Sequence, residues 1–151
     1  MKLIETCIDI NAPADRIWQV LTDFSAYTRW NPFIQSVEGA AHQGAHLVVT
    51  IAPLGKKPMT FKPTIITMEV NKQLQWRGKL LIPGLFDGQH CFTLEPQSDR
   101  CTRLHHSEQF SGLLAPLVFN SLNAATTAGF KAMNEALKKQ CESRSANEST
   151  S

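Results

Sequence analysis

Residues 23–33 read Asp-Phe-Ser-Ala-Tyr-Thr-Arg-Trp-Asn-Pro-Phe and place four aromatic rings and a proline within eleven residues. A regular helix cannot run through Asn31-Pro32, because proline disfavours helical backbone in the residue before it. We therefore expect a compact aromatic wedge that closes one end of a sheet. Within it, Asn31-Pro32 should form the turn that aims Trp30 and Phe33.

The sequence on both sides of this wedge is mostly strand-like. Residues 2–10 alternate apolar and polar side chains, which predicts a strand with one apolar face. A short helix with an apolar stripe should follow and end near Thr22. Strand-like segments then recur at 34–39, 45–52, 59–70, 73–82, 86–95 and 101–110. Turn signals separate them at roughly ten-residue spacing, which favours an antiparallel meander, with an irregularity expected at Pro63.

The hydrophobic period changes to that of a helix over 113–141. At about 1.5 Å per residue this helix would be roughly 35–40 Å long, enough to cross a small domain. We therefore predict an α+β fold in which a seven-stranded antiparallel sheet curls around a long C-terminal helix. Residues 1–141 should form one domain, and the polar segment 142–151 should be a disordered tail.

Composition narrows the classes of function. The chain has 151 residues and a formal net charge of +2, too small to indicate nucleic-acid binding. Its four cysteines lack any Cys-x-x-Cys spacing and suit a reducing compartment. The N-terminus lacks the apolar core of a signal peptide, and no apolar run reaches the length of a membrane span. We expect a soluble cytoplasmic protein without integral membrane association, whose oligomeric state the sequence does not indicate.

Three segments together resemble a known family. They are 23–33, the stretch 102–112 that contains Glu108, and 129–138 at the helix C-terminus. They resemble the START-like superfamily, whose broad bacterial branch is called SRPBCC or polyketide cyclase/dehydrase-like. The resemblance implies a helix-grip fold with short helices between strands 1 and 2. Members include lipid carriers, polyketide aromatases, plant hormone-binding proteins and chaperone co-activators, so the site must decide the function.

Candidate acid/base residues lie on the last two strands. Period two places His106 and Glu108 on the same face as Leu104, and His90 on the same face as Phe92. A buried carboxylate needs a partner or stays protonated, so Glu108 paired with His106 or His90 is a candidate for proton transfer. The alternative is structural, with Glu108 bonded to Arg103, Arg77, Tyr27 or the backbone near the wedge.

We expect an apolar cleft between the sheet and the helix, of the size that holds small molecules, about 300–1,000 Å³. The candidate ligand-binding residues are Trp30, Phe33, Trp76, Leu80, Phe92, Phe110, Phe119, Leu122, Phe130 and Met133. Ordinary core packing is the competing interpretation for each of them. The apolar tip 81–86 is a candidate pocket rim, lid or contact patch.

Three functions fit these features. The first is binding or carrying a small hydrophobic or amphipathic molecule, such as a lipid, polyketide or aromatic metabolite. The second is a cyclase, aromatase or dehydratase that uses Glu108 with His90 or His106. The third is a protein-interaction role like that of a chaperone co-activator. Nucleotide and metal cofactors are not expected, because the glycine-rich motifs and metal-ligand spacings are lacking.

Overall fold

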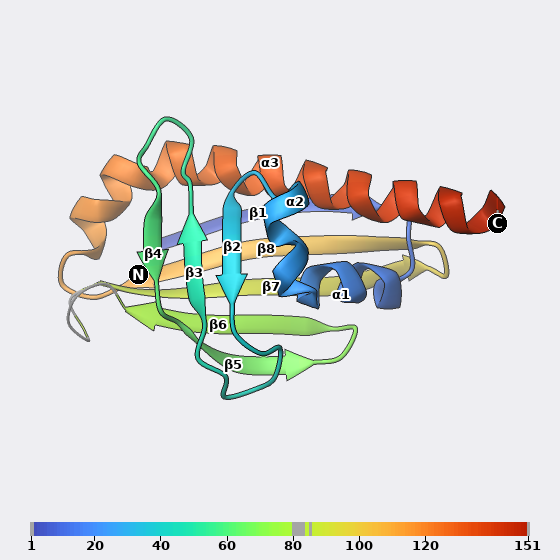
Figure 1. Ribbon diagram of the computed structural model, residues 1–151. Coiled ribbons are helices and arrows are strands. Elements are labelled where there is room, and N and C mark those ends of the chain that lie inside the picture. Colours follow the sequence, from blue (N-terminus) through green and yellow to red (C-terminus); the bar gives the residue numbers. More distant parts are fainter. Residues whose placement is uncertain (1, 80–83, 85, 151) are drawn as a thin grey trace.

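The computed structural model describes residues 2–79, 84 and 86–150. Within them the chain forms strands and helices in the order β1 (Lys2–Ile10), α1 (Ala14–Thr22), a 3₁₀ turn (Phe24–Ala26), α2 (Tyr27–Trp30), β2 (Ile34–Glu38), β3 (Val48–Ile51), β4 (Met59–Phe61), β5 (Thr64–Glu69), β6 (Gln73–Lys79), β7 (Asp87–Ser98), β8 (Cys101–Ser111) and α3 (Ala115–Thr150). Figure 1 shows α3 running along the length of the strands. The α+β helix-grip architecture predicted from the sequence is confirmed.

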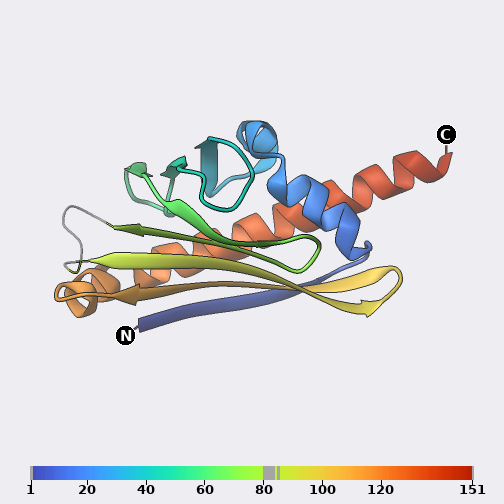
Figure 2. The same cartoon turned by 90° about the horizontal axis from the view of Figure 1, so that it is seen from below.

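The strands form two antiparallel sheets rather than one. The larger has the order β1-β8-β7-β6-β5 and the smaller β2-β3-β4. The smaller sheet crosses in front of the larger one in Figure 1 and lies over it in Figure 2. The described strands therefore number eight, not seven. Pro63, which has no N–H to donate, divides the predicted strand 59–70 into β4 and β5, one in each sheet.

The aromatic wedge packs into the core, where Phe24 meets Trp76 of β6 edge to face. Tyr27 is fully buried, its ring meets Phe24 and Trp30 edge to face, and its hydroxyl donates to the carbonyl oxygen of Leu21. The wedge is built from the 3₁₀ turn and α2, two short helical pieces, because Asn31 leaves the helical region of backbone space.

Asn31 fixes the direction of the chain after the wedge. Its Oδ1 accepts hydrogen bonds from the backbone N–H groups of Phe33, at 3.0 Å, and Ile34, at 2.9 Å. This side-chain turn sends Phe33 against Phe130 of α3, with ring centroids 5.5 Å apart. The turn predicted at Asn31-Pro32 is confirmed for Phe33.

The start of α3 differs from the sequence prediction. The helix begins at Ala115 rather than 113, after Gly112 with its positive φ of 107°. It continues to Thr150, whereas the sequence predicts a tail over 142–151; that division of the chain stays a prediction.

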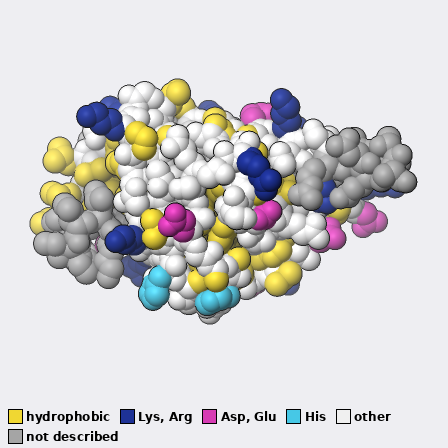
Figure 3. Space-filling view, viewed as in Figure 1, with side chains coloured by type: hydrophobic (Ala, Val, Ile, Leu, Met, Phe, Trp, Pro, Cys, Tyr) yellow, Lys and Arg dark blue, Asp and Glu magenta, His cyan; other side chains and the backbone are white. Residues whose placement is uncertain are grey.

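No helix in the described part of the chain has an apolar stretch long enough to span a membrane. Figure 3 shows the molecule from the same side as Figure 1, with charged side chains scattered over that face.

Candidate functional site

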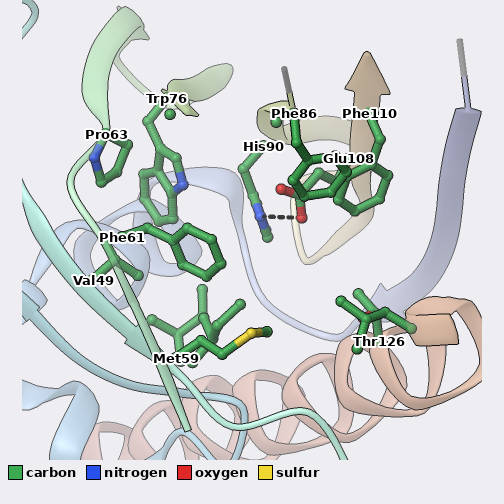
Figure 4. A pocket seen from close by; sticks show the side chains of 15 residues that line it. Val49, Met59, Phe61, Pro63, Trp76, Phe86, His90, Glu108, Phe110 and Thr126 are labelled. Carbon is green, nitrogen blue, oxygen red and sulfur yellow. Dashed lines mark ion pairs between the residues drawn. The ribbon is translucent and has the colours of Figure 1, made fainter. Parts of the chain in front are cut away.

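A cavity lies between the two sheets, close to the N-terminal half of α3 (Figure 4). The space free of atoms is about 680 Å³ when the solvent at its open mouth is included, but only about 60 Å³ of it has room for the centre of a water-sized molecule. The residues that line it are Ile34, Val49, Ile51, Met59, Phe61, Pro63, Trp76, Gly78, Phe86, Gly88, His90, Glu108, Phe110, Leu122 and Thr126. Most of the lining is apolar, as in pockets that hold small organic molecules, but the cavity is smaller than the roughly 300–1,000 Å³ typical of such pockets.

The wall opposite the large sheet differs from the one predicted. The sequence assigns that wall to α3, but β2, β3 and β4 supply most of it, and α3 contributes only Leu122 and Thr126 to the described lining. The reason is the division at Pro63, which lets β4 join β3 and close over the larger sheet.

Five of the predicted site residues line the cavity: His90, Glu108, Trp76, Phe110 and Leu122. The others that the structure describes lie outside its lining.

Those others belong to the protein core or its edge. Phe92, Phe130 and Met133 are completely buried, as is the predicted catalytic residue His106, and Phe33 is nearly so. Phe119 packs edge to face on Phe110 with centroids 5.9 Å apart. Trp30 lines a separate polar hollow with Val20, Asp23, Ala26, Arg29 and Gln140. Leu80, and the tip 81–86 apart from Gly84 and Phe86, lie outside the described residues.

The sequence prediction missed the β2–β4 side of the cavity. The alternation of Val49 and Ile51 indicates one apolar strand face, but nothing local shows that this face turns toward Trp76. Phe86 was predicted in part, because it belongs to the tip 81–86 that the sequence indicates as a candidate pocket rim. In the structure its ring stacks on that of Phe110, with centroids 5.5 Å apart.

His90 and Glu108 form the polar part of the cavity wall. They are cross-strand partners on β7 and β8, and His90 Nδ1 lies 3.2 Å from Glu108 Oε2 (Figure 4). Their side chains are 5% and 16% exposed. Arg103 pairs with Asp9 instead, so the alternative partner Arg103 is not used by Glu108.

Gly88 provides the space for this carboxylate. A Cβ atom at position 88 would lie 2.7 Å from Glu108 Oε1. The absence of a side chain there lets Glu108 fold over β7 toward His90.

Behind the pair a chain of buried polar groups runs through the protein core. His90 Nε2 lies 2.7 Å from His106 Nε2, and His106 Nδ1 lies 2.8 Å from Asn134 Oδ1. Asn134 Nδ2 donates to Thr6 Oγ1 at 2.9 Å, and Thr6 donates to the carbonyl oxygen of His106 at 3.1 Å. Sequence reasoning missed Asn134 and Thr6, because the contacts that give them a role join residues 28 and 100 positions from His106.

The core around His106 keeps its imidazole uncharged. Phe130 stacks on it at 4.0 Å between centroids, and Phe92 lies at 4.5 Å. Burial among these rings holds the pKa of His106 well below its usual value, the proximity of His90 acts in the same direction, and the hydrogen bond with Asn134 opposes them.

Among the described side chains that line the cavity, only His90 and Glu108 are ionisable, and none is a lysine or arginine. Within the same described part of the chain, no three histidine, cysteine, aspartate or glutamate residues come together in a way that could hold a metal ion. The site therefore offers an apolar surface, several aromatic rings and one histidine–carboxylate pair.

Comparison with known proteins agrees with this architecture. A family model described as "Polyketide cyclase / dehydrase and lipid transport" matches residues 1–142. No curated protein sequence matches the chain significantly.

Several solved structures share the fold. The Zhui aromatase/cyclase from Streptomyces sp. R1128 has a TM-score of 0.78 and 18% identity over 95% of this chain and 94% of its own. A norcoclaurine synthase point mutant from Thalictrum flavum, in complex with a transition-state analogue, scores 0.72 at 17% identity, over 95% and 96%. A START superfamily protein from Mycobacterium smegmatis scores 0.71 at 20% identity, over 93% and 97%.

Proposed function

Because the chain belongs to the polyketide cyclase / dehydrase and lipid transport family, within the START-like superfamily, we propose that it binds a small, largely apolar molecule between its two sheets. The observation that supports this most directly is the cavity itself. Its described walls are mostly apolar and aromatic, and the polar side chains of His90, Glu108 and Thr126 interrupt them.

The physical basis of binding is burial of apolar surface, which contributes roughly 25 cal/mol per Å². Trp76 and Phe61 offer flat surfaces to the ligand, and the His90–Glu108 pair fixes its orientation by one or two hydrogen bonds. A ligand of this kind is uncharged or carries its charge outside the cavity, because no cation among the described side chains of the lining would compensate a buried anion.

A fluorescence titration tests this proposal. N-phenyl-1-naphthylamine is an uncharged, apolar probe whose emission rises when it leaves water. It should bind the protein saturably at one site. Native mass spectrometry of freshly purified protein would in addition reveal a molecule that co-purifies in the cavity.

Two variants of α3 provide the matched comparison. Leu122→Trp places a large ring in the cavity and should weaken probe binding at least tenfold. Ala124→Trp places the same ring on the exposed surface of the same helix and should leave binding unchanged. Equal affinity in both variants, or no saturable binding by the native protein, would contradict the proposal.

Proton transfer on the bound molecule is a second candidate function, and the position of Glu108 at the cavity surface favours it. One oxygen of Glu108 contacts His90, and the other lies over Gly88. A carboxylate beside an imidazole is an arrangement suited to general acid–base catalysis. The protein-interaction role stays a prediction, because most of the tip 81–86 lies outside the described residues.

A neutral model substrate tests this second candidate. 5-Nitrobenzisoxazole opens its ring when a base removes its C–H proton: the proton goes to the base, and the N–O bond breaks to release a cyanophenolate. The native protein should accelerate the reaction, and Glu108→Gln should lose about 100-fold of that rate while still binding N-phenyl-1-naphthylamine. Equal rates with and without protein would count against this function.

A further inference from the structure

We infer that Thr6 and Asn134 are positioning residues that act through His106 to set the tautomer of His90, whose Nε2 carries a proton and whose Nδ1 faces Glu108 at the cavity wall. The inference rests on the proposed function only in treating this pair as the polar part of the binding site. It concerns buried residues of β1 and α3 that do not themselves line the cavity.

The direction of each hydrogen bond in this chain follows from one end, where a backbone carbonyl oxygen can only accept. The backbone carbonyl oxygen of His106 lies 3.1 Å from Thr6 Oγ1, so the single hydroxyl proton of Thr6 points to it. Thr6 Oγ1 must then accept from Asn134, whose Nδ2 is 2.9 Å away. The reverse orientation of the Asn134 amide would bring a carbonyl oxygen against a hydroxyl that has no proton left to donate.

The orientation of Asn134 determines the proton on His106. With Nδ2 facing Thr6, Asn134 Oδ1 faces His106 Nδ1 at 2.8 Å and accepts from it. His106 therefore carries its proton on Nδ1. Since His106 is completely buried and lies against the ring of Phe130, it stays neutral, and its Nε2 has a free lone pair.

The position of the proton on His106 determines in turn which nitrogen of His90 is protonated. Its Nε2 lies 2.7 Å from Nε2 of His106, and two lone pairs at that distance would repel, so His90 Nε2 carries a proton and donates it. The other nitrogen of His90, Nδ1, then faces Glu108 Oε2 at 3.2 Å.

The buried residues behind the wall thus fix Nε2 of His90 as a hydrogen-bond donor to His106. They leave Nδ1 as the nitrogen of His90 that meets Glu108 at the cavity wall.

Nuclear magnetic resonance of the histidine side chains tests the inference in the ligand-free protein. In a ¹⁵N-labelled sample at pH 7, long-range ¹H–¹⁵N spectra separate protonated from bare imidazole nitrogens. We expect His106 with its proton on Nδ1, although free neutral histidine favours Nε2. A proton on Nε2 of His106 in the native protein would overturn the inference without any variant.

Two substitutions at one position separate positioning from mere packing. Asn134→Asp keeps an acceptor opposite His106 Nδ1 and should preserve the Nδ1–H tautomer. Asn134→Leu removes the acceptor, and His106 should move to Nε2–H, which in turn moves the proton of His90 to Nδ1. An unchanged His106 tautomer in Asn134→Leu would show that Asn134 does not set it.

The change of tautomer has a consequence at the cavity wall. In Asn134→Leu the nitrogen of His90 that faces the cavity wall changes from bare to protonated, so the ¹⁵N resonance of His90 Nδ1 should change with that of His106. An unchanged His90 resonance in a folded variant would contradict the link to the cavity wall. If the tautomers are as inferred but N-phenyl-1-naphthylamine does not bind the native protein, the proposed function fails while this inference stands.

Discussion

The ring of Phe33 lies against the backbone of α3 at Gly129, where a Cβ atom would come within 3.0 Å of three ring atoms. Phe33 is the last residue of the aromatic wedge, and Gly129 precedes Phe130, which contacts the same ring. The absence of a side chain on Gly129 thus lets the wedge dock on the long helix.

Gly129→Ala should destabilise the protein. Alanine improves helix propensity by up to about 1 kcal/mol, but the overlap with Phe33 should cost about 1–3 kcal/mol and outweigh it. Urea unfolding monitored by circular dichroism measures the difference. The double variant Gly129→Ala/Phe33→Leu should recover part of the loss. A more stable single variant would show that Phe33 can move away freely.

Gly88→Ala should leave stability within about 0.5 kcal/mol of the native value. The new Cβ atom meets the mobile end of Glu108 rather than a rigid ring, so the carboxylate can turn aside. The cost should appear instead at the site, as a changed ¹⁵N resonance of His90 Nδ1 and weaker binding of N-phenyl-1-naphthylamine. A native His90 spectrum in this variant would contradict the close packing of Glu108 over Gly88.

The depressed pKa of His106 makes stability depend on pH. Below about pH 6.5 the unfolded chain binds a proton at this residue that the folded protein does not, so stability falls as pH falls through that window. Above it, the contribution is fully present. His106→Gln should reduce the slope between pH 6.5 and 5.5 by up to about 1.4 kcal/mol per pH unit.

Urea midpoints at several pH values measure that slope. The exposed His42, replaced by Gln, is the control for losing a histidine as such. Parallel curves for the native protein and His106→Gln would mean that His106 is protonated in the folded state.

The cavity should discriminate by charge. 1-Naphthol and 1-naphthoate share one ring system, and the uncharged phenol should bind at least about tenfold more tightly at pH 7, since dehydrating a carboxylate without a cationic partner costs several kcal/mol. Competition with N-phenyl-1-naphthylamine measures both affinities. Tighter binding of the carboxylate would require a cation that is not among the described lining residues.

Much of the fold could be predicted from local patterns. The alternation in residues 2–10 matches β1, and the long helical period matches the body of α3. Each of these signals comes from neighbours in sequence, so it survives without tertiary information. Pro63 was expected to disturb a strand, but its effect is larger: it sends β4 and β5 into different sheets.

The candidate site, like the fold, could be predicted from the sequence only in part. His90, His106 and Glu108 were grouped correctly on one face, because side chains two apart in a strand share a face. Their roles were not separable: His90 and Glu108 reach the cavity, whereas His106 is buried behind them.

By itself the sequence determined the types and order of the elements and the inward row of polar groups, because periodicity is a property of adjacent residues. Tertiary structure alone decided which surfaces face each other. It placed β2–β4 over the large sheet to enclose the cavity, and it brought Thr6 and Asn134 to His106. Hydrogen bonds depend on positions in space to a few tenths of an ångström, and residues 28 or 100 positions apart carry no local mark of that proximity.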